Sequence, residues 1–376
     1  MFLIEKLLLK EVAHLFTGLR RLGHTFCLTC IATLAMTVSA QAQDADGTIE
    51  GSVQSSNGQE AGVWVIAETD DLPTHFIKIV VTDDEGRFML PDMPDALYEV
   101  WVRGYGLVDS NPVSLRVGAD VTLNAFVAES PLEAAQIYPA NYWYSLLEVP
   151  DADEFPGTGA DGNGISERMR SQAQWIDMTK QGCQLCHQLG NKLTRSLDHL
   201  SHLGFESSVE AWNYRTAIGI RGPLMSAFAG RFGRERGMAM YADWTDRIAA
   251  GELPPAPERP SGIERNVVLT LWDWGNESSY IHDEITTDKR NPTLNAGGKV
   301  YGVDGGHGTL VELDTTTNEF RTIEIAVSDN ADNPAVTRFA QEFPVESVFY
   351  GDEALWSGPA DPHNPMFDEI DRKSVV

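Results

Sequence analysis

The sequence feature that most constrains this chain is a short motif near its middle, Gly182-Cys183-Gln184-Leu185-Cys186-His187. Two cysteines with two residues between them, followed at once by histidine, have the spacing of c-type haem attachment. At the start of a helix, this spacing presents both thiols to one edge of the haem for thioether bonds. The imidazole of the adjacent histidine then ligates the iron. The motif predicts one covalent haem c, held by Cys183 and Cys186, with His187 as iron ligand.

Two other roles compete for the same cysteines. A redox dithiol of the thioredoxin type would prefer a strand-to-helix context, which the flanking sequence does not offer. A zinc site would need a second ligand pair at comparable spacing. Of the four cysteines in the chain, Cys27 and Cys30 lie in an expected leader, so Cys183 and Cys186 alone would remain after cleavage.

The N-terminus has the form of an export signal. Arg20 and Arg21 give a positive flank, residues 26–40 are mostly apolar, and Ala40-Gln41-Ala42 has the small-x-small pattern of a cleavage site. The apolar run has 15 residues, fewer than the roughly 20 that a transmembrane helix needs. We therefore expect a signal peptide over 1–42, a periplasmic or secreted protein, and no stable membrane span after cleavage; an uncleaved amphipathic anchor is the alternative.

Length limits the number of domains in this chain, and net charge limits the classes of molecule that it can bind. A chain of 376 residues is long enough for two or three domains. The formal net charge of -27 argues against nucleic acid, whose phosphates attract lysine and arginine, and against an anionic membrane surface. An acidic surface suits solubility or docking to a basic partner. The expected partner is a redox protein, either a dehydrogenase or another cytochrome.

The residues after the haem motif offer a sixth iron ligand. The segment 222–228 resembles the Gly-x-x-Met-Pro-Ala-Phe loop of small class I cytochromes c, with Ser226 where proline is usual. The resemblance implies that Met225 ligates the iron, and a helix of the cytochrome C-terminal kind is expected over 234–250 with apolar residues on one face. Met238, Met240, His199 and His202 are the rival ligands. An open site would make the haem a candidate catalyst.

Residues before the haem motif predict an all-β domain. Alternating strands are expected at 48–53, 62–67, 76–82, 86–90, 98–103 and 113–127, with a hairpin turn at 83–86. Through its segments 51–53, 62–67, 82–91 and 98–105, the stretch 46–129 resembles a carboxypeptidase regulatory-like domain, a small transthyretin-like β-sandwich. Such domains bind sugars or brace neighbours. Trp64, Trp101 and Tyr105 are candidates for a sugar site, and core packing is the alternative for each.

Two regions follow the sandwich along the chain. Residues 130–165 are expected to form a connector broken by prolines, and residues 166–262 to form a cytochrome c-like haem domain. Within the connector, residues 161–167 faintly resemble a calcium loop, but a true EF-hand loop needs more ligands at fixed positions. A solvated turn is the alternative.

The tail 263–376 changes character again. A strand is expected at 266–274, and three more at 299–304, 309–314 and 319–325 have the pattern of one β-propeller blade. The tail resembles lyase-type propellers related to virginiamycin B lyase and gluconolactonase-like proteins. Closing a propeller takes about four to eight blades, so about 110 residues predict an incomplete propeller and a reading frame that stops early.

The whole arrangement resembles multidomain bacterial proteins with a carboxypeptidase regulatory-like domain. The expected fold is an all-β transthyretin-like sandwich, an α-helical c-type cytochrome domain and a partial β-propeller. The expected function is electron transfer, and the alternative is a propeller-based periplasmic lyase, lactonase or dehydrogenase with an accessory haem. No catalytic residue is assigned. Five polar residues of the tail are candidates for a metal or catalytic site: His282, Asp283, Glu284, His307 and His363. The alternative is that they are polar turn residues.

Overall fold

The computed structural model describes residues 47–184, 187–219, 221–276, 278–326, 362–368 and 374–375. The expected signal peptide, 1–42, lies outside the described residues, and so does Cys186 of the haem motif. Within the described ranges, no helix combines the length and apolar character needed to cross a bilayer.

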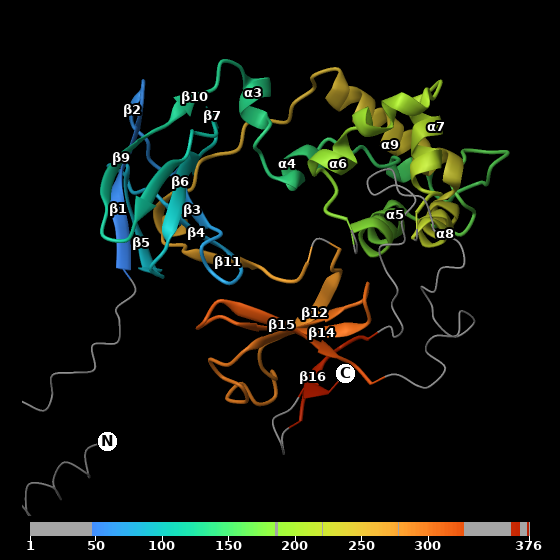
Figure 1. Ribbon diagram of the computed structural model, residues 1–376. Coiled ribbons are helices and arrows are strands. Elements are labelled where there is room, and N and C mark those ends of the chain that lie inside the picture. Colours follow the sequence, from blue (N-terminus) through green and yellow to red (C-terminus); the bar gives the residue numbers. More distant parts are fainter. Residues whose placement is uncertain are drawn as a thin grey trace, which may run out of the picture. The chain divides into compact units, whose positions relative to one another are not determined.

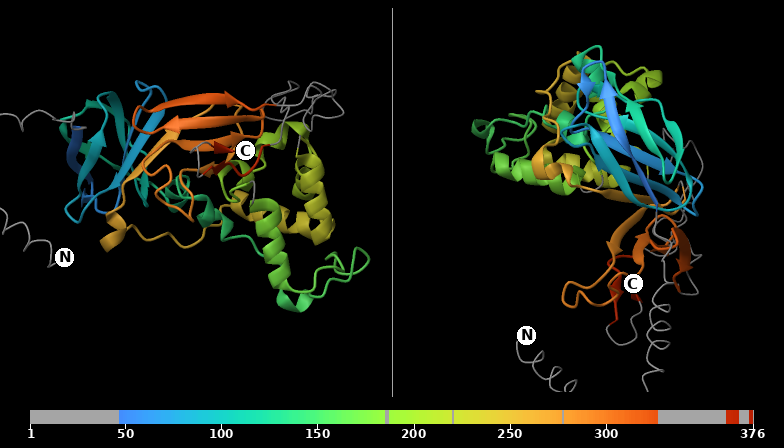
Figure 2. Two further views of the ribbon diagram at one scale, coloured as in Figure 1. Left: turned by 90° about the horizontal axis from the view of Figure 1, so that it is seen from below. Right: turned by 90° about the vertical axis from the view of Figure 1, so that its left-hand side faces the viewer.

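The N-terminal part is a β-sandwich of two sheets, drawn in blue to teal in Figures 1 and 2. In the first sheet, β1 (Gly47–Ser55) lies between β2 (Gly58–Gln59) and β5 (Arg87–Met93), and it also pairs in parallel with β9 (Asp120–Asn124). The second sheet has the order β11-β4-β3-β6-β8. Its strands are β3 (Trp64–Thr69), β4 (His75–Val81), β6 (Leu97–Arg103), β8 (Val113–Arg116) and β11 (Leu269–Asp273). A short pair is formed by β7 (Leu107–Val108) and β10 (Phe126–Val127).

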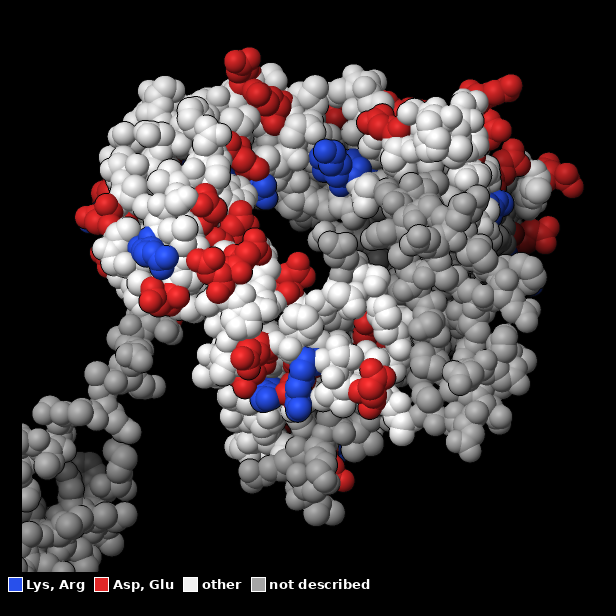
Figure 3. All heavy atoms as spheres, viewed as in Figure 1, with Lys and Arg blue, Asp and Glu red and all other residues white. Residues whose placement is uncertain are grey.

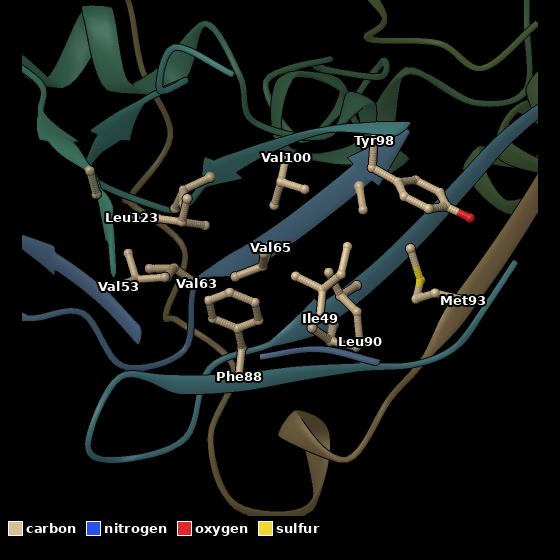
Figure 4. Packing of buried hydrophobic residues seen from close by; sticks show 14 of the residues in the cluster. Ile49, Val53, Val63, Val65, Phe88, Leu90, Met93, Tyr98, Val100 and Leu123 are labelled. Atoms are coloured by element: carbon tan, nitrogen blue, oxygen red, sulfur yellow. The ribbon is translucent and has the colours of Figure 1, made fainter. Parts of the chain in front are cut away.

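Alternation along the strands builds the core of the sandwich. Every second residue of β4 and β6 is buried, because successive side chains of a strand point to opposite faces. Figure 4 shows Ile49, Leu90 and Phe88 of the first sheet facing Val65 and Val100 of the second across the interior. The expected sandwich strands are therefore present, with 113–127 divided into three shorter strands.

A tight turn joins β4 to β5 at the predicted position. The Asp83 carboxylate accepts hydrogen bonds from the backbone N–H groups of Glu85 at 3.0 Å and Arg87 at 2.8 Å. Gly86 has φ +73°, a conformation that suits glycine because it has no Cβ. Asp and Gly at these positions are thus what the turn requires.

The strand expected at 266–274 differs from the prediction in its partner. It is β11, and it pairs antiparallel with β4, from Leu269 opposite Ile79 to Asp273 opposite His75. It is therefore an edge strand of the sandwich and not the first strand of the C-terminal sheet. Trp272 packs its ring 6.0 Å from that of Phe76 at this edge.

The middle of the chain is helical, drawn in green to yellow in Figure 1. Its α-helices are α3 (Pro131–Ala135), α4 (Ala140–Tyr144), α5 (Gln172–Thr179), α6 (Lys192–Arg195), α7 (Ser208–Arg215), α8 (Gly222–Phe232) and α9 (Arg234–Ala249). Short 3-10 segments occur at Ala152–Glu154, Asp198–Leu203 and Gly262–Arg265, and a π-helix at Lys180–Gln184.

The predicted helix 234–250 is α9, and it carries the helical core. Met238, Tyr241 and Trp244 are buried along one face, as helical spacing predicts. The Trp244 ring N–H donates to the Trp143 carbonyl at 2.9 Å, which ties α9 to α4. The segment expected to be a connector thus forms short helices that pack on the helical core.

The last sheet is a four-stranded antiparallel meander in the order β12-β13-β14-β15. Its strands are β12 (Ile281–Ile285), β13 (Val300–Asp304), β14 (Thr309–Asp314) and β15 (Glu319–Glu324). Short strands β16 (Met366–Phe367) and β17 (Ser374–Val375) pair with each other. Five successive residues of β14, from Thr309 to Leu313, are buried, so this strand is the centre of the unit.

Candidate functional site

The haem motif begins at the C-terminal end of a helix. Helix α5 is capped by Ser171, whose side chain accepts the Gln174 backbone N–H at 3.2 Å, and it continues into the π-helix that contains Cys183. The His187 N–H then donates to the Cys183 carbonyl at 3.0 Å, so His187 lies one turn beyond the cysteine. The motif thus lies at the C-terminal end of a helix, whereas the sequence predicted it at the start of one. Single π-helical turns are frequent at functional sites.

Cys183 and His187 line one cavity that is partly open to solvent. Most lining side chains are apolar or aromatic. The lining residues are Gly182, Cys183, His187, Leu189, Thr194, Trp212, Arg215, Thr216, Met225, Phe228, Ala229, Phe232, Met238 and Tyr241.

Glycines allow the close approaches around this cavity. A Cβ on Gly182 would lie 2.6 Å from the Phe228 ring, so the residue before Cys183 lets that ring pack on the backbone. Gly190 has φ +98°, and a Cβ there would lie 1.9 Å from the Ala140 carbonyl oxygen. The chain just after the motif therefore passes against α4 in a way that only glycine permits.

Of the two basic side chains of the cavity, Arg215 affects the pKa of His187. Burial lowers the pKa of His187, and the charge of Arg215 lowers it further, so the imidazole is neutral and has a free lone pair for a metal. Burial also lowers the pKa of Arg215, to about 10. Arg215 donates through Nη2 to the Leu193 carbonyl at 2.7 Å, and its guanidinium carbon lies 4.9 Å from the Trp212 ring centroid.

One atom of Arg215 stands out at the cavity wall. Its Nη1 is buried and has no hydrogen-bond partner within the described residues. Burying a cationic donor without a partner is unfavourable, so this position suits an anionic group of a bound molecule. Sequence reasoning missed Arg215, because nothing in its neighbourhood distinguishes it from other helical arginines.

Tyr241 contacts the cysteine from the other side. Its hydroxyl donates to Cys183 Sγ at 3.2 Å, and its ring stacks on Trp212 with centroids 5.0 Å apart. Burial, together with the nearby Cys183 thiol, raises the pKa of Tyr241 well above its usual value of 10.0. The phenol therefore remains a hydrogen-bond donor to the sulfur over the whole physiological range.

Met225 lines the same cavity, but from a helix. Residues 222–228 form the first turns of α8, where the sequence predicted a loop; Pro223 stands in its first turn, where proline is well tolerated. Met238 of α9 also lines the cavity, whereas Met240 is buried and is not among the lining residues. The Thr216 hydroxyl approaches the Met238 sulfur at 3.6 Å, so that sulfur already has a partner.

The two rival histidines do not line this cavity. They belong to the 3-10 segment Asp198–Leu203, where His199 is half-buried and His202 is exposed. Burial is the main cause of the lowered pKa of His199, and the charge of Arg215 lowers it further. Of the candidate ligands from the sequence, the cavity thus brings together Cys183, His187, Met225 and Met238.

Two of the three aromatic candidates in the sandwich share a second cavity. Trp64 and Tyr105 pack edge to face with ring centroids 4.9 Å apart and line a cavity of about 350 Å³ together with residues of the segment 258–269. Trp101 is not among its lining residues. Instead the Trp101 ring N–H donates to a Glu68 carboxylate oxygen at 2.9 Å.

The loop at 161–167 is a hydrogen-bonded turn. The Asn163 side-chain oxygen accepts the backbone N–H of Thr158 at 3.0 Å and that of Ile165 at 3.2 Å. The amide that would be a calcium ligand is therefore used inside the loop. This arrangement agrees with the solvated-turn interpretation.

Three of the five polar candidates in the tail meet. His282, Asp283 and His363 place one ligand atom each within 4.8 Å of the others. Burial raises the pKa of Asp283, but hydrogen bonds from the Asn364 backbone and the His363 imidazole, together with the charge of His282, lower it more, so the carboxylate stays ionised. Glu284 is exposed and is not part of this group.

His307 belongs to a different set of contacts. Its Nδ1 lies 2.7 Å from a carboxylate oxygen of the buried Asp304, and its Nε2 lies 3.3 Å from the Ser278 hydroxyl. The Ser278 hydroxyl donates at a shorter distance, 2.8 Å, to the Asn276 side chain. Asp304 also accepts the backbone N–H groups of Tyr280 and Gly306, so this group organises a turn.

Comparison with known proteins adds little to this description. No protein-family model matches the chain, and no curated protein matches it. Among solved structures, the chain is similar to part of a type II cohesin-X-dockerin complex from Acetivibrio cellulolyticus, an N-terminal interface mutant, with 15% identity over 27% of this chain and 71% of that chain. The TM-score is 0.19, which is too low to assign a shared fold.

Proposed function

We propose that this chain is an exported c-type haem protein that transfers electrons. The observation that carries the proposal is one apolar cavity lined by three of the four residues that the sequence assigns to haem: Cys183, His187 and Met225. Cys186, the fourth, is three positions beyond Cys183 in the motif. Residues that are far apart in the sequence thus line one cavity, which supports the proposal.

The chemistry of the lining residues fits a haem. Apolar and aromatic walls suit the porphyrin ring, and the buried Arg215 Nη1 would be available as a donor to the haem carboxylates. Cys183 and Cys186 would hold the ring covalently, and the neutral His187 would ligate the iron. Bound there, the haem iron supplies one-electron redox chemistry.

Met225 is the residue that would supply a second protein ligand to the iron. It lines the cavity from α8, and its competitor Met238 has its sulfur against the Thr216 hydroxyl. A thioether is a soft ligand that favours ferrous iron and raises the reduction potential. Trp212, Phe228 and Phe232 would exclude water from the ring, which also favours the form with less charge on the iron.

The surface charge supports docking to a redox protein. Figure 3 shows Asp and Glu side chains spread over the described part of one face, with few Lys and Arg among them. The chain as a whole has a net charge of -27. A dehydrogenase or another cytochrome with a basic face would be attracted by this field, and the association rate would fall as salt screens it. The expected signal peptide would place this exchange in the periplasm or outside the cell.

The remaining assignments belong to the same proposal. The sandwich is assigned as a carboxypeptidase regulatory-like domain, the helical part as a cytochrome c-like domain, and the meander of β12 to β15 as a blade of a β-propeller. The four-stranded meander has the size of one blade. A propeller-based lyase, lactonase or dehydrogenase with an accessory haem is the alternative function.

The test is haem retention after denaturation. The full chain, exported in a host with working haem maturation, should keep its haem stain through denaturing electrophoresis, and its reduced spectrum should be that of a haem c. The Cys183→Ser/Cys186→Ser variant should lose the stain completely, whereas Met225→Ala should keep it because the thioether bonds remain. A colourless wild-type protein with a Cys183–Cys186 disulfide would support the redox-dithiol alternative instead.

A further inference from the structure

A second group of metal-ligating side chains lies in the C-terminal sheet unit. His282 and Asp283 are on β12, and His363 is on the segment 362–368. His363 Nδ1 lies 3.0 Å from Asp283 Oδ2, and His282 Nδ1 lies 3.2 Å from the same oxygen. The two imidazole rings are tilted against each other with centroids 4.8 Å apart. Both rings therefore converge on one carboxylate oxygen.

An irregularity in β12 creates this convergence. Adjacent residues of a regular strand point to opposite faces, so His282 and Asp283 would normally diverge. The register between β12 and β13 shifts between His282 and Ile285, and Asp283 has φ +54°, which is uncommon for a residue with a Cβ. Such bulges redirect side chains and are frequent beside active sites. Here the bulge turns the Asp283 carboxylate toward the neighbouring imidazole.

The backbone of the segment 362–368 also hydrogen-bonds to the Asp283 carboxylate. The Asn364 N–H donates to Asp283 Oδ2 at 3.0 Å, which places His363 beside the strand. The three side chains are 21%, 33% and 52% exposed for His282, Asp283 and His363 respectively. An ion can thus enter from solvent on the His363 side, while the other two ligands are partly enclosed.

The spacing suits a small coordination sphere. Zinc bonds to imidazole nitrogen and carboxylate oxygen are about 2.1 Å long, which puts neighbouring ligand atoms of a tetrahedron about 3.4 Å apart. The three ligand atoms lie within 4.8 Å of one another, and two of the nitrogen–oxygen separations are 3.0 and 3.2 Å. We propose that His282, Asp283 and His363 bind one divalent transition-metal ion of the zinc class.

The donor set decides the class of metal. Imidazole nitrogens suit zinc, iron, nickel and copper, whereas magnesium and calcium prefer oxygen ligands throughout. Two imidazoles and one carboxylate are three protein ligands, the number found at catalytic zinc sites, where water or a substrate oxygen takes the fourth position. The site is therefore open to a ligand, in contrast to the closed four-ligand structural sites. It shares no residue with the cavity around Cys183.

Zinc alone is the probe for this site. The haem-loaded full chain is stripped with a chelator, dialysed against zinc chloride and analysed for bound zinc, because unreacted Cys183 and Cys186 would bind zinc themselves. We expect one equivalent of zinc in the wild type. The haem-free Cys183→Ser/Cys186→Ser variant should also bind one equivalent, which makes the outcome independent of the proposed haem.

Single substitutions locate the ion. His282→Gln, Asp283→Asn and His363→Gln should each weaken zinc binding by at least about tenfold, since even second-sphere changes cost that much. His75→Gln is the matched control, because His75 also sits beside carboxylates, with Nδ1 2.7 Å from Asp70 and Nε2 3.8 Å from Glu68, and it should leave zinc binding unchanged. Far-ultraviolet circular dichroism identifies any variant that has lost its fold.

Three outcomes would overturn the proposal. The first is a wild type that retains no zinc after dialysis. The second is a folded His282→Gln/His363→Gln double variant that binds zinc as tightly as the wild type. The third is displacement of zinc by a large excess of magnesium, which would reject the transition-metal assignment. In the first two cases the three side chains would be a hydrogen-bonded surface cluster only, and in the third they would form a site for a different class of cation.

Discussion

The sandwich and the helical region use buried apolar residues in different ways. In the sandwich, the side chains of two facing sheets fill one continuous core, from Ile49 and Leu90 to Val65 and Val100. In the helical region, Trp212, Phe232 and Tyr241 are also buried, but they surround a cavity as well as packing on each other.

This difference shows where each region gains its stability. The sandwich depends on side-chain volume, so its weak points are the large residues at its centre. The helical region also depends on close approaches to its backbone, such as Gly182 against Phe228 at the cavity wall and Gly190 against Ala140 outside it. A ligand that fills the cavity would add stability by binding the folded state.

The largest effect on the helical region should come from Gly190→Ala. Its Cβ would lie 1.9 Å from the Ala140 carbonyl oxygen, and φ is +98°, so strain and overlap combine. We expect a loss of more than about 3 kcal/mol in local stability, measured by hydrogen exchange of α4 and α6. Gly204→Ala is the matched control: φ is +67° with no atom within 4 Å, so it should cost only about 1 kcal/mol. Equal effects of the two substitutions would contradict this account.

In the sandwich, the corresponding change is Leu90→Ala. Leu90 is 0% exposed in the centre of the core, and large-to-small changes at such sites cost about 3 kcal/mol. Its neighbour Met89 is 52% exposed, so Met89→Ala should change the stability by less than about 0.5 kcal/mol. Hydrogen exchange of β1 and β5 measures both. Loss of haem attachment in Leu90→Ala would mean that the two regions are not independent.

The C-terminal sheet should respond to acid through Glu312. Burial raises the pKa of Glu312, but hydrogen bonds from Arg321 and Lys299 outweigh it and lower the pKa from 4.5 to about 2. Because the folded pKa is the lower one, the stabilisation is complete above pH 4.5 and is lost as the pH falls toward 2. Solvent screens the exposed partners, so we expect Glu312→Gln to cost about 2 kcal/mol at pH 7.

Hydrogen exchange of β14 across this pH range measures the effect. Glu312→Gln should remove the acid sensitivity of β14 between pH 4.5 and 2. Glu319→Gln, at an exposed position of β15, should leave it in place. Unchanged acid sensitivity in Glu312→Gln would assign it to another carboxylate.

The smallest change in stability should follow from Met225→Ala, because Met225 is only half-buried. Its spectroscopic effect should be clear. The ferric wild type should show the weak near-infrared sulfur-to-iron band, and Met225→Ala should lose it, lower the reduction potential and bind carbon monoxide. Met240→Leu should keep the band, since Met240 does not line the cavity.

Other results would move the assignment of the sixth ligand. A band that persists in Met225→Ala would point to Met238. A low-spin wild type without the band would point to His199 or His202. A high-spin wild type would mean an open site, and the enzyme alternative would then become the better account.

Local patterns in the sequence predicted much of the fold. The sandwich strands follow from alternation, and α9 follows from the helical spacing of Met238, Tyr241 and Trp244. The partner of β11 could not be predicted, because alternation defines a strand but not the sheet that it joins. The segment 222–228 was predicted as a loop from a resemblance, although Pro223 in a first turn and the Ala and Met residues that follow also suit a helix.

The residues of the candidate sites also divide into those that the sequence predicts and those that it does not. The motif at Cys183 is local and was visible in the sequence, as was Met225. Arg215 and Tyr241 enter the cavity only through the packing of α7 and α9, for which one sequence gives no pattern. The contact between Asp283 and His363 spans 80 positions and depends on a bulge, so it became apparent only in three dimensions.

The mass of the mature protein tests the central claim most directly. Intact mass spectrometry of the exported full chain, under denaturing conditions, should show the polypeptide plus one haem, and proteolysis should place that haem on the peptide that contains Cys183 and Cys186. A mature protein with the mass of the bare polypeptide, from a host that matures another c-type cytochrome in the same experiment, would contradict the account.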